Sequence, residues 1–155
     1  MKIIVDTREQ RPFFKRGVVR RTLNVGDYST LTLEKCFAIE RKSLQDLYRT
    51  LIHNHPRFRR QIIRAIDRGI TMVMVVEGTY KDFVNKNFPR GSDRKCKPET
   101  LKKIISTVKR RYAIEIIFCK NVIKAKQFTL NRLKYEERKL ARTTRKRIIS
   151  KKDKA

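Results

Sequence analysis

The sequence predicts an α/β fold in which helices flank a central mixed β-sheet. Short β-branched segments fill residues 1–42, and apolar segments alternate with helical patterns after them. The most apolar segment, residues 71–77, is typical of a central strand that is covered on both faces and runs parallel to a neighbour. At 155 residues, the chain has the length of one domain with short appendages.

The first half is predicted to form a meander of strands. Asp6 ends the first strand, and Arg11 and Pro12 follow as a break. A mobile basic loop is expected over residues 13–17, and a turn at Gly26 and Asp27 is expected to join the second and third strands. The predicted strands are residues 2–6, 18–25, 30–33 and 36–42.

The second half predicts alternating helices and strands. Ser43 is a helix cap, and Gly69 is a helix end. A flexible basic loop is expected over residues 87–97. The predicted helices are residues 43–52, 58–68, 80–85, 98–111 and 121–140, and the predicted strands are 71–77 and 114–119. We therefore expect a domain over residues 1–140 and a basic, flexible tail over residues 141–155.

The net charge of +26 favours polyanionic partners. No segment approaches the ~20 apolar residues of a membrane span, and no basic helix with aromatic anchors stands out, so no membrane role is expected. Cys36, Cys96 and Cys119 form no CxxC pair, which argues against a zinc site or a disulfide framework and favours a reducing cytosol. The chain begins in a strand-like segment, and no signal peptide is expected.

The segment around Glu40, Arg41 and Lys42 carries the strongest chemical signal. In a strand, Glu40 and Lys42 point to the same side, with Arg41 on the other. A carboxylate can hold a divalent cation while the ammonium positions a water, and Asp27 offers a second carboxylate. Alone, Glu40–Lys42 could equally be a solvated charged patch, and Asp27 a turn residue after a glycine.

Four segments together resemble the XPF/Hef family of structure-specific endonucleases. They are Ile-Ile-Val-Asp-Thr-Arg-Glu from residue 3, Gly-Asp-Tyr-Ser from residue 26, Glu-Arg-Lys from residue 40 followed after three intervening residues by Asp46, and Val-Val-Glu-Gly from residue 75. The resemblance covers residues 2–119. It implies a restriction-endonuclease-like core and metal-dependent cleavage of forks, flaps or junctions in DNA repair, recombination or replication. It also implies Mg²⁺ or Mn²⁺ as the cofactor.

The resemblance also assigns expected roles. Asp27 and Glu40 would be metal ligands, and Lys42 would hold the attacking water or stabilise developing charge. Asp6 would bind metal or orient other ligands.

Four further residues are expected to support the site. Arg8 could hold an acidic neighbour or a phosphate, although a surface ion pair is the alternative reading for Arg8 and Glu9. Arg41 could be a buried pairing partner. Asp46 fits a capping box with Ser43, which predicts a supporting role rather than metal binding.

Several basic or polar residues are candidates for nucleic-acid contacts. Arg59 and Gln61 lie on a helix that the resemblance places beside the cleaved strand, with an exposed helix face as an equal alternative. The full set is Arg59, Gln61, Arg90, Arg94, Lys95, Lys97, Arg145, Lys146 and Arg147.

Many family members carry helix-hairpin-helix motifs, which need glycines, and no glycine follows Gly91 here. We expect branched DNA as the partner, and the C-terminal helices are candidates for a homodimer or heterodimer interface. The competing functions are a non-catalytic DNA-binding subunit on the same fold and a basic RNA-binding protein. The expected location is the cytoplasm or nucleoid, or the nucleus in a eukaryote.

Overall fold

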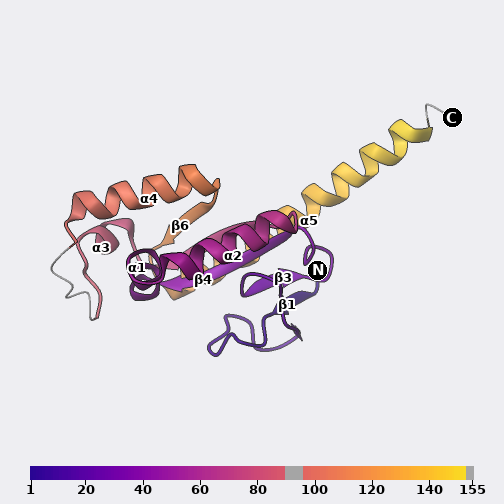
Figure 1. Ribbon diagram of the computed structural model, residues 1–155. Helices are drawn as coiled ribbons and strands as arrows, with labels where there is room; N and C mark the ends of the chain where they lie inside the picture. Colours follow the sequence, from indigo (N-terminus) through magenta and orange to yellow (C-terminus); the bar gives the residue numbers. More distant parts are fainter. Residues whose placement is uncertain (90–95, 153–155) are drawn as a thin grey trace.

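The computed structural model describes residues 1–89 and 96–152. A six-stranded mixed sheet forms the centre, in the order β2-β1-β3-β4-β5-β6 (Figure 1). β1, β3 and β4 are antiparallel neighbours, whereas β4, β5 and β6 run parallel. The strands are β1 Ile3–Val5, β2 Val19–Arg20, β3 Tyr28–Thr30, β4 Phe37–Ser43, β5 Thr71–Glu77 and β6 Glu115–Cys119.

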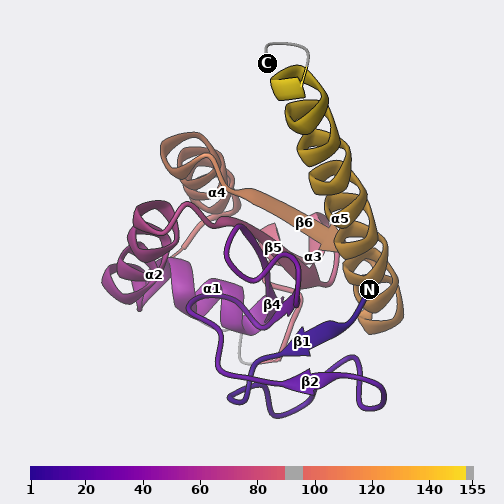
Figure 2. The same cartoon turned by 90° about the vertical axis from the view of Figure 1, so that its right-hand side faces the viewer.

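Helices cover both faces of the sheet (Figure 2). They are α1 Leu44–Ile52, α2 His55–Asp67, α3 Tyr80–Val84, α4 Pro98–Tyr112 and α5 Val122–Lys152. Met72 and Met74 of β5 pack among residues of α1 to α4, while Val73 and Val75 pack on the other face with Leu133 of α5. The alternation of strand side chains thus divides the core into two layers, and it confirms β5 as a central, doubly covered strand.

The meander prediction is correct for β1, β3 and β4 but wrong for β2. The expected strand over residues 18–25 shrinks to β2, which pairs parallel to β1 at the sheet edge. The strand expected over residues 30–33 begins earlier, at Tyr28, and a turn follows Thr30.

Gly26 and Asp27 do not form the predicted hairpin turn. The Asp27 amide donates to the Ile39 carbonyl at 2.8 Å, so the chain runs close beside β4. A Cβ on Gly26 would lie 2.9 Å from the Ala38 Cβ, and Gly26 has a φ of +78°. Only glycine meets both conditions without strain, and this close approach fixes Asp27 beside Glu40.

The loop over residues 13–17 is not free throughout, because Phe13 is buried. Its amide donates to the Tyr28 hydroxyl at 2.9 Å, and the two rings stack with centroids 5.2 Å apart. The free energy gained by burying this aromatic side chain fixes the start of the segment, although the residues that follow Phe13 are basic and were expected to be mobile.

Two helix boundaries also differ from prediction. α2 begins at His55 rather than near residue 58, because Pro56 is tolerated in the first turn of a helix. α5 continues to Lys152 instead of ending near residue 140, and no glycine or proline interrupts it. The division into a domain over 1–140 and a tail over 141–155 stays a prediction. Within the described residues, no helix is long and apolar enough to cross a membrane.

Candidate active site

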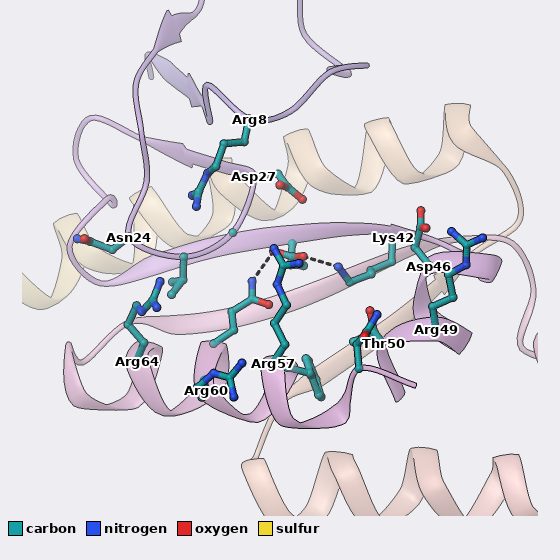
Figure 3. A pocket seen from close by; sticks show the side chains of 16 residues that line it. Arg8, Asn24, Asp27, Lys42, Asp46, Arg49, Thr50, Arg57, Arg60 and Arg64 are labelled. Atoms are coloured by element: carbon teal, nitrogen blue, oxygen red, sulfur yellow. Dashed lines mark hydrogen bonds and ion pairs between the residues drawn. The ribbon is translucent and has the colours of Figure 1, made fainter. Parts of the chain in front are cut away.

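The carboxyl-terminal half of β4 places the predicted residues as strand alternation requires. Glu40 and Lys42 point towards α2, and the Lys42 Nζ lies 2.6 Å from the Glu40 Oε1 (Figure 3). The second carboxylate oxygen of Glu40 accepts a hydrogen bond from the Gln61 amide of α2 at 2.8 Å. Glu40 is therefore held from its own strand and from the helix that covers it.

Asp27 lies beside this pair. One of its carboxylate oxygens accepts a hydrogen bond from the Arg41 amide at 2.7 Å. Burial, reinforced by the negative charge of Glu40, raises the pKa of Asp27 to about 8. The carboxyl group is thus placed where its charged form is poorly compensated within the chain.

The three side chains open into one cleft with a volume of about 660 Å³, between the end of β4, α1 and α2. Three acidic residues line it: Asp27, Glu40 and Asp46. Basic residues surround them in Figure 3, and these are Arg8, Lys42, Arg49, Arg57, Arg60 and Arg64. The basic side chains attract the phosphates of a nucleic-acid backbone, whereas the carboxylates at the centre of the cleft repel them. A phosphate can therefore bind at the centre only if the charge of these carboxylates is neutralised.

The basic side of the cleft comes mainly from α2. Arg57, Arg60 and Arg64 are three and four residues apart, so they share one helix face with Gln61. Arg59 is exposed and does not line the cleft, which matches the alternative of an exposed helix face, and its contact with nucleic acid stays a prediction. The helical spacing from Arg57 was the signal that could have found these arginines in the sequence.

Arg41 occupies the opposite face of β4. Its Nε lies 2.6 Å from Glu77, a second nitrogen lies 3.4 Å from Glu9, and it also donates to the Arg11 carbonyl. The guanidinium stacks over the Phe13 ring at 4.5 Å. Burial opposes the charged form, but these carboxylates outweigh it and raise the pKa of Arg41. Arg41 thus joins three segments of the chain, as expected of a buried pairing partner.

Asp6 is almost fully buried and is held by four donors. Arg8 binds both carboxylate oxygens at 2.7 and 2.9 Å, its amide adds a third hydrogen bond, and the Leu23 amide adds a fourth at 2.6 Å. Burial raises the pKa of Asp6, yet these donors outweigh it and leave the pKa below its usual value. Because Asp6 has four donors and does not line the cleft, the arrangement argues against metal binding by Asp6 and for its orienting role.

Glu9 also accepts from the Arg11 amide at 2.8 Å, and it does not line the cleft.

Asp46 acts at the start of α1. Its amide donates to the Ser43 hydroxyl at 3.0 Å, and the Ser43 hydroxyl donates to its carboxylate at 2.7 Å. The capping prediction is correct in its residues, although the carboxylate binds the hydroxyl rather than the Ser43 amide.

A family model for the ERCC4 domain matches residues 5–149. The chain belongs to the ERCC4 domain family. The resemblance to XPF/Hef-type nucleases is therefore confirmed. No curated protein sequence matches the chain.

Solved structures support the fold of this ERCC4 domain. XPF from Aeropyrum pernix is 19% identical with a TM-score of 0.68, over 94% of this chain and 69% of that chain. A structure of XPF from Aeropyrum pernix in complex with DNA is 20% identical with a TM-score of 0.65, over 88% of this chain and 65% of that one. These matches confirm the restriction-endonuclease-like α/β fold.

The donor set of the ERCC4 domain fits a hard divalent cation at two carboxylates. Carboxylate oxygens are the ligands that Mg²⁺ and Mn²⁺ prefer. Burial, together with the negative charge of Glu40, raises the pKa of Asp27, so a bound cation would stabilise its ionised form. Among the described residues, no group of three or more His, Cys, Asp or Glu side chains is arranged to hold a metal. Asp27 and Glu40 would therefore supply the protein ligands, and other oxygens would complete the coordination.

The remaining predicted contacts lie outside the cleft or outside the described residues. Lys97 precedes α4 and Arg145 lies near the end of α5, and both are exposed. Arg90, Arg94 and Lys95, and the side chains of Lys146 and Arg147, lie outside the described residues.

Proposed function

We propose that the chain is a divalent-metal-dependent endonuclease that cuts branched or structured DNA, such as forks, flaps or junctions, in DNA repair, recombination or replication. Membership of the ERCC4 domain family supports a nuclease, and the XPF relative from Aeropyrum pernix has been solved in complex with DNA. The observation that carries the proposal is the cleft, where Asp27, Glu40 and Lys42 meet inside an arginine rim.

In the proposed reaction, Asp27 and Glu40 would hold Mg²⁺ or Mn²⁺, which supplies charge neutralisation at the phosphate and lowers the pKa of an attacking water. Lys42 stands 2.6 Å from Glu40 and can donate to a water or to a non-bridging phosphate oxygen. Gln61 keeps the second oxygen of Glu40 oriented. Arg57, Arg60 and Arg64 offer donors to neighbouring phosphates.

The proposal is tested by incubating the protein with labelled fork, flap, junction and linear duplex DNA, with Mg²⁺, Mn²⁺ or a chelator. The expected result is cleavage of branched substrates with either metal and none with the chelator. Metal-independent cleavage, or no cleavage of any substrate with either metal, would overturn the proposal.

A second candidate is a non-catalytic DNA-binding subunit on the same fold. Both oxygens of Glu40 are already engaged, by Lys42 and by Gln61, and a cation at Glu40 has to displace at least one of these contacts. Tight, metal-independent binding of branched DNA without cleavage would favour this candidate.

We further propose that the chain acts in the cytoplasm or nucleoid, or in the nucleus of a eukaryote, and that α5 contributes to a homodimer or heterodimer. Sedimentation of the full chain tests the second point: the expected result is a particle of twice the mass of one chain, and a monomer would overturn it.

A further inference from the structure

α5 consists of a packed half and a projecting half. The helix spans 31 residues, which corresponds to a length of about 46 Å. Ala125, Thr129 and Leu133 are fully buried against the sheet, and Leu140 is the last described residue of α5 that packs on the core. Residues 141–145 are all exposed, and the helix continues away from the sheet (Figures 1 and 2).

A stripe of cations runs along the exposed side of this helix. The cationic stripe consists of Lys134, Arg138, Arg142 and Arg145, which are exposed and spaced four, four and three residues apart. This spacing places them on one helix face. Among the described residues, none of the four forms an ion pair. Like charges at this spacing destabilise a free helix, so a polyanion bound along the stripe would stabilise it.

The acidic residues of the same region do not offset the stripe. Glu136 is engaged by Arg132 at 2.9 Å and by Lys139 at 3.8 Å. One carboxylate oxygen of Glu137 is buried. The outer face of α5 from residue 134 to residue 145 is therefore positive along its length.

We propose that the cationic stripe of α5 is a second DNA-binding surface, which holds the phosphate backbone of a DNA duplex. A helix with its side chains is about 10–12 Å wide, which suits the B-form major groove of about 12 Å. The narrow major groove of double-stranded RNA does not admit such a helix. Single strands would need stacking rings, and Tyr135 is the sole aromatic residue between 134 and 145. A membrane surface would need an apolar face, which this stretch lacks.

The stripe and the cleft lie on different sides of the sheet. Glu40 and Lys42 face the layer of α1 and α2, whereas α5 packs on the layer of Ile39, Val73 and Val75. The two surfaces therefore hold different segments of the DNA. This inference rests on the proposed function, since it adds a duplex arm to the segment that the cleft would cut.

The test is a charge reversal on the cationic stripe, Arg138→Glu, Arg142→Glu and Arg145→Glu together. Binding of a fluorescent DNA duplex is measured by anisotropy across a range of salt concentrations, in a chelator so that no cleavage intervenes. We expect affinity to fall at least about tenfold near physiological salt. A plot of the logarithm of the association constant against the logarithm of the salt concentration has a negative slope, and this slope should become less steep by about 2.7, since each lost phosphate contact removes about 0.9.

A matched control reverses three exposed charges on α4, Lys102→Glu, Lys103→Glu and Arg110→Glu. It has the same net charge as the α5 variant, so an equal loss in both would reflect the overall field and overturn the proposal. Circular dichroism checks that both variants keep their helices.

Two further ligands complete the test. A double-stranded RNA of equal length should show a smaller change of slope, and an equal change would contradict the choice of duplex DNA. Loss of binding to anionic vesicles with unchanged DNA binding would overturn the proposal in favour of a membrane surface. Because binding in a chelator does not depend on cleavage, failure of the nuclease proposal and failure of this one are distinguishable.

Discussion

Asp6 directly follows β1 and Asp27 directly precedes β3, at the same end of these two neighbouring strands, yet their environments are opposite. The Asp6 amide donates to the Asp27 carbonyl at 2.8 Å, so the two residues are direct neighbours. Asp6 receives four hydrogen bonds, and the pKa of Asp6 is lowered. Among the described residues, the carboxylate of Asp27 receives one, and the pKa of Asp27 is raised to about 8.

The difference separates a carboxylate that holds the fold from one that can take a ligand. The charge of Asp6 is compensated by the chain itself. The charge of Asp27 is opposed by burial and by Glu40, so a bound cation would stabilise its ionised form. The same contrast divides β4, where Arg41 is fully paired on one face and Glu40 and Lys42 open into the cleft on the other.

The largest expected effect is loss of cleavage in Asp27→Asn or Glu40→Gln. Each variant removes a proposed metal ligand while keeping the shape of the side chain. DNA binding, measured by anisotropy, should persist because the arginine rim is unchanged. Glu99→Gln, an exposed residue of α4, is the matched control and should keep full activity. Full activity in either cleft variant would show that the site is assigned to the wrong residues.

Asp6→Ala should affect stability. It leaves the Leu23 amide and the Arg8 guanidinium without their buried acceptor, at a cost of about 3 kcal/mol. For a chain of this length, the melting temperature should fall by roughly 10 °C. Asp6→Asn should cost less because the amide oxygen still accepts. An unchanged melting temperature in Asp6→Ala would show that Asp6 has no structural role.

Lys42→Ala should lower the cleavage rate by about 10²-fold, the scale of losing one positioned catalytic group. DNA affinity should change little, because Lys42 is one of several cations around the cleft. Single-turnover kinetics at saturating DNA separates the two. A weaker affinity with an unchanged rate would make Lys42 a phosphate contact only.

The final prediction concerns the change of stability with pH, which should have opposite signs for Asp6 and Asp27. Ionised Asp6 stabilises the fold above its usual pKa of 3.8, and this gain is lost as pH falls through its lowered pKa. The advantage of the wild type over Asp6→Asn should therefore shrink in acid. The raised pKa of Asp27 means that its contribution is complete below pH 3.8 and is lost as pH rises towards 8.

Asp27→Asn should consequently gain stability over the wild type between pH 4 and pH 8. Melting curves of the three proteins in a chelator check both signs. A gap between the wild type and Asp27→Asn that stays constant with pH would contradict the assigned environment of Asp27.

The sequence predicts the core of this fold well where residues interact with near neighbours. The alternation along β4 separates Glu40 and Lys42 from Arg41, and the apolar run of β5 predicts a central parallel strand; both are confirmed. The helix cap at Ser43 is likewise local and is confirmed.

Long-range contacts decide the features that the sequence does not predict. The sequence around Gly26 predicts a turn, because the neighbouring residues give no sign that Gly26 packs closely against Ala38. Phe13 reads as part of a loop because its partner Tyr28 lies 15 residues away. Three of the four hydrogen bonds to Asp6 come from the nearby Arg8, but the fourth comes from Leu23 in a separate segment, and the burial of Asp6 also depends on the folded chain. The difference between Asp6 and Asp27 therefore emerges only in three dimensions.

Binding of Mn²⁺ tests the central claim most directly, because it requires neither a DNA substrate nor turnover. Mn²⁺ is titrated into the wild type, Asp27→Asn and Asp6→Asn, and the free ion is followed by electron paramagnetic resonance. The account predicts that the wild type and Asp6→Asn bind Mn²⁺ with similar affinity and that Asp27→Asn loses this binding. Equal binding by all three proteins, or none by the wild type, would contradict it.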